Sequence, residues 1–246
     1  MGIRTSFFVD ADKRQLSHCV DLNVDCIEIH CGSYCRSFDS KMPSAGDEFL
    51  KIKNISDLRN GVKIGSSSKR RELQLKKINS NISVINIRGN IDTRIKKLDS
   101  GYCDGIVLAS AGLERLQISS RVSNYFNEEE MLNAPAQGAI AVETRNSGKI
   151  KELISKLDHL NTRLCVSQER LFLKTLMGGC TSPIGAYAKI EKNTITLKGS
   201  ILSLDGKKSI TKELKREYNN SNIGVDLAHS ILNSGGHNIL ADSRSK

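Results

Sequence analysis

Short apolar segments typical of β-strands alternate with segments typical of α-helices between about residue 61 and residue 116. The strand-like segments are VKIGS, SVINIRG and DGIVLAS, and the helix-like segments that follow them are SSKRRELQLKKI, NIDTRIKKL and GLERL. Strands that alternate with helices predict a mainly parallel α/β sheet. Ligands of such sheets bind outside the carboxyl ends of the strands. The pattern therefore predicts an α/β fold and the edge at which a site would lie.

The flanking segments predict further parts of the chain. Residues 3–9 and 26–30 resemble strands around a helix, and such a strand–helix–strand unit, placed within residues 1–40, normally has parallel strands. Residues 41–60 begin with a polar stretch that contains Pro and Gly, which predicts a linker before an α/β domain over 61–129.

The remainder of the chain predicts a helical stretch and a small C-terminal domain. Residues 147–177 are helix-like, Ser147 and Asn161 are candidate caps, and Gly178 is the expected stop. Within residues 178–246, AYAKIE, TITLKGSIL and SITKEL are strand-like, a helix is predicted over roughly 222–233, and NILAD predicts a last strand. The predicted fold class is α/β: a parallel-type α/β domain, part of a second α/β domain, and a small C-terminal α+β domain.

Arginine recurs at one kind of position, the end of a predicted strand or the start of the helix after it. These arginines are Arg70, Arg71, Arg88, Arg94 and Arg115. In a parallel sheet such positions share one edge, and guanidinium groups bind carboxylates with paired hydrogen bonds. Neighbouring serines and helix N-terminal amides would add donors. The pattern predicts a ligand with several negative groups, and the alternative is a set of separate surface arginines paired with acidic neighbours.

The loop GGCTSPIG, residues 178–185, places Cys180 between a Gly pair and Pro-Ile-Gly. Glycine permits backbone angles closed to other residues and proline fixes one, which predicts a shaped loop that could display a thiol. A helix C-terminus disfavours a thiolate, and no acid or base lies nearby in the sequence. Local features therefore favour a small buried cysteine over a nucleophile, and they leave open a site of covalent attachment.

Charge and composition narrow the class of partner. The formal net charge of +10 favours anionic partners in general. The basic clusters at 69–71, 76–77 and 94–97 are not interleaved with aromatic residues, so a base-stacking surface is not predicted. No apolar run approaches the length of a membrane span.

The cysteines indicate a reducing compartment. The chain has 7 cysteines without regular spacing, which predicts free thiols in the cytoplasm and not a secreted disulfide framework. Several Cys and His residues lie within the first 35 positions, but no CxxC spacing occurs among them. No metal site is therefore predicted.

Four stretches resemble the porphobilinogen deaminase family, also called hydroxymethylbilane synthase. They are KIGSSSKRRELQL, VINIRGNIDTRIKKLDSGYCDGIVLASAGLERL, NAPAQGAIAVETR and GGCTSPIGAYA, and the resemblance runs in order from about residue 42 to the end. It implies a transferase of tetrapyrrole (heme) biosynthesis that joins four porphobilinogens head to tail and releases ammonia. The family grows this chain on a dipyrromethane cofactor, thioether-linked to the loop cysteine that matches Cys180.

The resemblance also implies roles for the arginine positions, because porphobilinogen carries an acetate and a propionate. The cofactor-binding residues implied are Cys180, Ser68, Arg70, Arg71 and Arg94, and the substrate-binding residues implied are Arg88, Arg94, Arg115 and Gln137. We expect a monomer that binds this small-molecule substrate, with no nucleic acid, membrane or metal as a partner.

The sequence departs from the family at its start. The family begins with a domain that this chain largely lacks, including a Lys-Asp motif whose aspartate is the catalytic acid, and no Lys-Asp pair occurs here. The catalytic residues are therefore unknown, and we expect impaired catalysis. Residues 130–177 would be a remnant of that first domain. Residues 2–38 instead resemble a fragment of pyridoxine 5′-phosphate synthase, a barrel that one strand–helix–strand unit cannot close.

Three functional hypotheses follow. The first is a porphobilinogen deaminase-like enzyme that lacks its catalytic aspartate. The second is a non-catalytic fusion remnant that binds polycarboxylates through the arginine edge. The third is a basic nucleic-acid-binding protein, whose binding would depend steeply on salt concentration.

Overall fold

The computed structural model describes residues 6–10, 26–30, 47–50, 58–142, 149–177, 183–218 and 222–244. The chain divides into two compact units. One comprises Met1–Met42 and Ala139–Leu160, and the other comprises Pro43–Gly138 and Asn161–Lys246. None of the helices in the described ranges combines the length and apolar composition needed to cross a membrane.

The first unit contains a parallel pair of strands. Strand β1 (Ser6–Asp10) pairs with β2 (Cys26–His30) in parallel, with Ser6 opposite Cys26, as the strand–helix–strand pattern predicts. The two strands form a two-stranded sheet of their own. Helix α6 (Lys149–Ser155) belongs to the same unit. Residues 139–142, part of the predicted first-domain remnant, form no strand.

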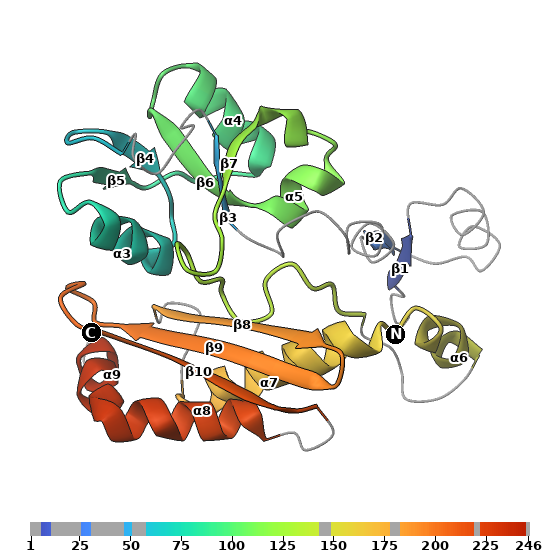
Figure 1. Cartoon of the computed structure of the whole chain (residues 1–246). Helices are drawn as coiled ribbons and strands as arrows, with labels where there is room; N and C mark the ends of the chain where they lie inside the picture. Colours follow the sequence, from blue (N-terminus) through green and yellow to red (C-terminus); the bar gives the residue numbers. More distant parts are fainter. Residues whose placement is uncertain are drawn as a thin grey trace. The chain divides into compact units, whose positions relative to one another are not determined.

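The second unit contains a five-stranded sheet with the order β5-β4-β6-β3-β7 (Figure 1). Its strands are β3 (Asp47–Leu50), β4 (Lys63–Gly65), β5 (Ser83–Ile85), β6 (Gly105–Ala109) and β7 (Val122–Tyr125). Strand β4 runs parallel to β5 and β6, as the alternating pattern predicts. Strand β3 runs antiparallel to both β6 and β7, so the sheet is mixed.

Part of the segment predicted as a linker belongs to this sheet. Within residues 41–60, β3 pairs with a strand on each side. It has four residues after a polar stretch, so it is too short to show the alternation by which a strand is recognised in a sequence.

Helices cover both faces of the sheet. They are α3 (Lys69–Ile78), α4 (Ile91–Asp99) and α5 (Ser110–Arg115), and a 3-10 turn over Ser119–Arg121 leads into β7. Val107 of β6 packs in one apolar cluster with Leu75 of α3, whereas Ile106 packs in another with Leu98 and Leu113. Successive residues of β6 thus face opposite cores, as in a sheet buried on both sides.

The C-terminal part of the same unit is a three-stranded antiparallel sheet backed by helices (Figure 1). The strands are β8 (Ile184–Glu191), β9 (Thr194–Leu202) and β10 (Ser209–Glu217), in the order β10-β9-β8, and the helices are α7 (Leu160–Thr175), α8 (Ile223–Ile231) and α9 (His237–Arg244). An added Cβ at Gly199 of β9 would meet both Phe172 of α7 and Leu227 of α8. The two helices therefore pack closely on one face of the sheet.

One sequence prediction for this part is wrong. The predicted last strand NILAD lies in α9, after a kink within Leu232–Gly236 where Ser234 and Gly235 leave helical backbone angles. Ile239 and Leu240 are both buried in the core, and a short apolar run of this kind does not distinguish a helix from a strand. The helical stretch predicted over 147–177 contains two helices, and the second begins at Leu160, next to the candidate cap Asn161.

Helix α8 approaches the backbone of α7 at Gly224. A Cβ there would lie 2.2 Å from the carbonyl oxygen of Gln168. We predict that Gly224→Ala lowers the free energy of unfolding by about 2 kcal/mol or more, because the two helices must separate. His229→Ala, at an exposed position of the same helix, is the control and should change it by less than about 0.5 kcal/mol. Urea unfolding of both variants tests this, and equal values would contradict the close approach.

Candidate functional site

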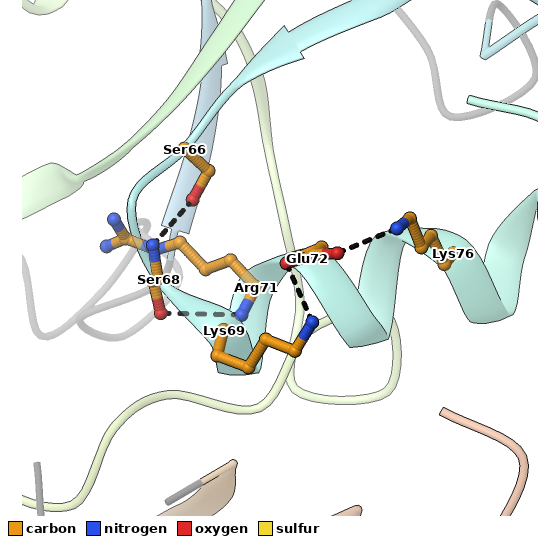
Figure 2. A network of polar contacts seen from close by, with 6 residues as sticks. All are labelled: Ser66, Ser68, Lys69, Arg71, Glu72 and Lys76. Carbon is orange, nitrogen blue, oxygen red and sulfur yellow. Dashed lines mark hydrogen bonds and ion pairs between the residues drawn. The ribbon is translucent and has the colours of Figure 1, made fainter. Parts of the chain in front are cut away.

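The loop after β4 orients the N-terminus of α3 at the carboxyl edge of the sheet. The hydroxyl oxygen of Ser66 accepts a hydrogen bond from the Ser68 amide at 3.2 Å, and the Ser68 hydroxyl caps α3 by accepting from the Arg71 amide at 3.4 Å (Figure 2). Ser67 donates to Asn86 Oδ1 at 2.8 Å, in the loop that follows β5. These bonds hold the serine loop, which carries the predicted residue Ser68, next to the loop that leads into α4.

Helix α3 also carries its own charge compensation. Glu72 accepts hydrogen bonds from Lys69 at 3.1 Å and Lys76 at 2.7 Å (Figure 2). Burial would raise the pKa of Glu72, but the two ammonium groups outweigh it and the pKa is lowered. Lys69 and Lys76 are thus paired within the helix. Arg71 instead extends toward β6, where its Nη1 donates to the Val107 carbonyl at 3.3 Å.

Arg71 and Arg94 form the centre of the site and are called the arginine pair below. Arg94, in the first turns of α4, donates from Nε to the Gly89 carbonyl at 2.8 Å. Its pKa is lowered, first by burial and then by the positive charge of Arg71. Among the described residues, no carboxylate forms a salt bridge with Arg94. Two guanidinium groups that repel each other at a strand edge favour a bound anion.

The other two predicted substrate-binding arginines lie further out. Arg88 is exposed in the loop after β5, and its carbonyl accepts from Lys97 Nζ at 3.2 Å. Arg115 was expected early in its helix, but it is exposed in the last turn of α5 because that helix begins directly after β6 and has only six residues. Within the described ranges, neither side chain pairs with a carboxylate.

Arg70 differs from its neighbours because its guanidinium is buried against the protein. The residue is 5% exposed, and Nη1 donates to the Leu132 carbonyl. Nη2 donates to Oε1 of Gln137 at 3.3 Å. Gln74, one turn later, adds reciprocal bonds with the Leu132 backbone at 2.8 and 3.1 Å. Arg70 therefore brings the predicted residue Gln137 to the start of α3.

Residues 131–138, called the bridging segment below, connect α3 to the C-terminal sheet. The Ala186 amide of β8 donates to the Asn133 carbonyl at 2.9 Å, and a Cβ at Gly185 would lie 3.1 Å from Cβ of Leu132. The chain between α7 and β8 includes residues 178–182, among them Cys180, and these five residues lie outside the described part of the chain. The bridging segment thus contacts the strand that follows the predicted anchor loop.

Glu169 of α7 is a buried acid that the sequence analysis did not single out. It is 6% exposed, and its carboxylate accepts from the Ala136 amide at 2.6 Å and the Ala188 amide at 2.7 Å. Burial raises the pKa of Glu169 to about 7, although both amide donors act to lower it. Cys165, one turn earlier, has its pKa raised to about 12 by burial and by the charge of Glu169. The thiol of Cys165 therefore stays neutral.

A signal for Glu169 was present in the sequence. Cys165, Phe172 and Leu176 form the buried stripe of an amphipathic helix, and Glu169 occupies the same stripe. A carboxylate on the apolar face of a helix indicates a buried polar contact. Its partners could not be identified from sequence, because both are backbone amides.

A groove of about 510 Å³ lies beside the C-terminal half of α3. Its lining includes Gln74, Lys77 and Leu132, and Lys198 pairs with Glu129 at its border. None of the predicted site residues within the described ranges lines it. The candidate site is therefore the arginine pair with the bridging segment, and not this groove.

Comparison with known proteins agrees with the order of these parts. Residues 40–152 match the family model for the dipyrromethane cofactor-binding domain of porphobilinogen deaminase, and residues 163–233 match the model for its C-terminal domain. The chain belongs to the porphobilinogen deaminase family. This confirms the family predicted from the four sequence stretches. The matched cofactor-binding domain contains every predicted site residue except Cys180.

Curated relatives give the extent of the similarity. Porphobilinogen deaminase of Clostridium acetobutylicum is 42% identical over 180 residues, covering 73% of this chain and 61% of that protein. The enzyme of Clostridium botulinum strain 657 is 42% identical over 191 residues, covering 76% and 64%, and that of Syntrophobacter fumaroxidans is 39% identical over 192 residues, covering 77% and 62%. The chain thus spans less than two thirds of the length of these relatives.

Solved structures add little to this comparison. A TRAP periplasmic solute-binding protein from Desulfovibrio salexigens is 18% identical, with a TM-score of 0.26 over 46% of this chain and 37% of that chain. A similarity at this level carries no argument about fold or function.

The raised pKa of Glu169 predicts a pH-dependent stability. The folded protein binds a proton at Glu169 more tightly than the unfolded chain, because the pKa rises from 4.5 to about 7 on folding. This contribution to the free energy of unfolding is fully present below about pH 4.5 and is lost as the pH rises through about 7. Between pH 5 and pH 8, the free energy of unfolding of the wild type should therefore fall by on the order of 2 kcal/mol relative to that of Glu169→Gln.

Urea unfolding of both proteins at the two pH values measures this difference. Glu152→Gln, at an exposed position of α6, is the control and should show no such change. A difference between wild type and Glu169→Gln that does not vary with pH would contradict the assignment.

Proposed function

We propose that this chain is a porphobilinogen deaminase-like transferase that carries a dipyrromethane on Cys180 and binds its carboxylates at the arginine pair. The observation that carries this proposal is the placement of both residues at the starts of α3 and α4, where Arg71 donates to the Val107 carbonyl, Arg94 donates to the Gly89 carbonyl, and their positive charges repel each other. A ligand with several carboxylates would relieve that repulsion. When bound, the dipyrromethane supplies the pyrrole end onto which porphobilinogens are joined with release of ammonia.

The chain's own residues would orient and hold the polycarboxylate. The arginine pair binds the first acetate and propionate groups with charge-assisted hydrogen bonds. Amides at the start of α3, ordered by the Ser68 cap, add donors for an anion. The exposed Arg88 and Arg115 would meet the carboxylates of added porphobilinogen units. Gln137, held by Arg70, would lie beside the bound rings.

We further propose that turnover is impaired, because the sequence has no Lys-Asp motif to supply the catalytic acid. The alternative is a non-catalytic remnant that binds polycarboxylates without a covalent cofactor. Both the impaired enzyme and the non-catalytic remnant are compatible with the lengths of the relatives. This chain leaves 36–39% of the Clostridium acetobutylicum and Clostridium botulinum proteins unmatched. We expect the protein to act as a monomer in a reducing cytoplasm, because its cysteines lack the regular spacing of a secreted disulfide framework.

Covalent loading tests the proposed function. The purified chain is incubated with porphobilinogen or preformed hydroxymethylbilane, and intact and peptide masses are compared with those of Cys180→Ser. We predict an added mass of two pyrrole units on the Cys180 peptide after incubation with porphobilinogen, or of four after incubation with hydroxymethylbilane, which loses water as the thioether forms. We also predict a positive Ehrlich reaction and little ammonia release after loading. Loading with sustained ammonia release would show a working enzyme and contradict the impairment. The absence of any adduct on Cys180 would favour the non-covalent remnant.

The arginine pair can be tested in the same assay. Arg94→Gln should reduce the loaded fraction about tenfold or more at limiting ligand, because a hydrogen bond to a charged group contributes about 1.5–3 kcal/mol. Arg121→Gln is the control, since Arg121 is already paired with Asp99 at 2.5 Å and lies outside the site. Equal loss of loading in both variants would indicate a general effect of net charge and contradict the assignment.

A further inference from the structure

The bridging segment contains a tight turn whose backbone is not relaxed. The Gln137 amide donates to the Ala134 carbonyl at 3.0 Å, with Pro135 and Ala136 between them. Ala136 has φ of 66°, in the left-handed region that glycine adopts most easily. An alanine in this conformation persists where the surroundings hold it in place. The turn sets the position of Gln137, which directly follows Ala136.

The interaction that holds this turn is the bond from the Ala136 amide to Glu169. At 2.6 Å it is among the short bonds expected for a charged acceptor, and the second oxygen of Glu169 accepts from Ala188 at 2.7 Å. Strand β8 is at the edge of its sheet, and the amides of Ala186 and Ala188 are bound by Asn133 and Glu169 instead of by another strand. One carboxylate therefore fastens both the turn and the edge strand.

Glu169 lies at a particular point along the chain. Its helix, α7, directly precedes residues 178–182, and Ala188 lies in β8, which directly follows them. Ala136 precedes Gln137, whose side chain is bound by Arg70 at the start of α3. A single buried side chain thus connects the two flanks of the loop that bears Cys180 with the segment bound by Arg70.

We propose that Glu169 is a positioning residue, whose carboxylate fixes the bridging segment against both flanks of the Cys180 loop and so sets where Gln137 lies relative to the attached cofactor. This rests on the proposed function only in taking Cys180 as the attachment point. The coupling itself concerns residues within one compact unit. It predicts that loss of one acceptor oxygen releases either the turn or β8 while the rest of the C-terminal core stays formed.

The neighbouring Gln168 provides a matched control. It is 4% exposed, in the same helix, and its side-chain oxygen accepts from the Gly224 amide of α8 at 3.1 Å. Truncation of either residue removes a buried hydrogen bond from α7. Of the bonds described above, those of Glu169 reach the bridging segment and β8, and that of Gln168 reaches α8, so a general loss of stability and a loss of positioning can be separated.

The experiment is residue-resolved amide hydrogen exchange on the full chain. In Glu169→Gln, whose amide group offers one acceptor in place of two, exchange at Ala136 or Ala188 should rise at least tenfold while Gly224 is unchanged. In Gln168→Ala the pattern should reverse. Adding Ala136→Gly to Glu169→Gln should restore the turn, measured as protection of the Gln137 amide. If Glu169→Gln does not fold, Glu169→Asp, which retracts the carboxylate, is measured instead with the same expectation.

A second readout is the initial rate of cofactor loading on Cys180. The two variants are compared at one temperature at which both are fully folded. We expect Glu169→Gln to load at least fivefold more slowly than Gln168→Ala. Uniformly faster exchange in both variants, or unchanged exchange at both Ala136 and Ala188, would overturn the proposal. If the wild type itself does not load, the proposed function fails while the exchange pattern still decides the role of Glu169.

Discussion

The bridging segment is the constraint on which the rest of the site depends. It presents backbone carbonyls to Arg70, Gln74 and Ala186, and an amide to Glu169. Each of these partners is wholly or partly buried, and a buried polar group left without a partner is costly. The contacts therefore favour one arrangement of α3, the segment and β8, which a purely apolar interface would specify less strictly.

The arginines of this edge divide into two kinds by their surroundings. The guanidinium of Arg70 donates hydrogen bonds to the Leu132 carbonyl and to Gln137, and so orders the bridging segment. Arg71 and Arg94 approach each other closely enough for their charges to interact unfavourably. Two lysines of α3, Lys69 and Lys76, by contrast pair with Glu72 within their own helix.

Local patterns predicted much of this arrangement. The alternation of strands and helices predicted the parallel core β4, β5 and β6. The position of β3 between β6 and β7 could not be predicted, because pairing with two distant strands leaves no local trace. The different partners of Arg70 and Arg71 could not be predicted either, because the two residues are adjacent in sequence. In the structure Arg70 binds the bridging segment and Arg71 binds the backbone of β6.

The account is tested most directly by an experimental structure of the chain after loading with dipyrromethane. It predicts that the cofactor is attached to Cys180 and that its carboxylates accept hydrogen bonds from Arg71 and Arg94, with Arg70 still bound to Gln137. A structure in which the cofactor carboxylates lie in solvent while Arg71 and Arg94 pair with acidic side chains of the protein would contradict it.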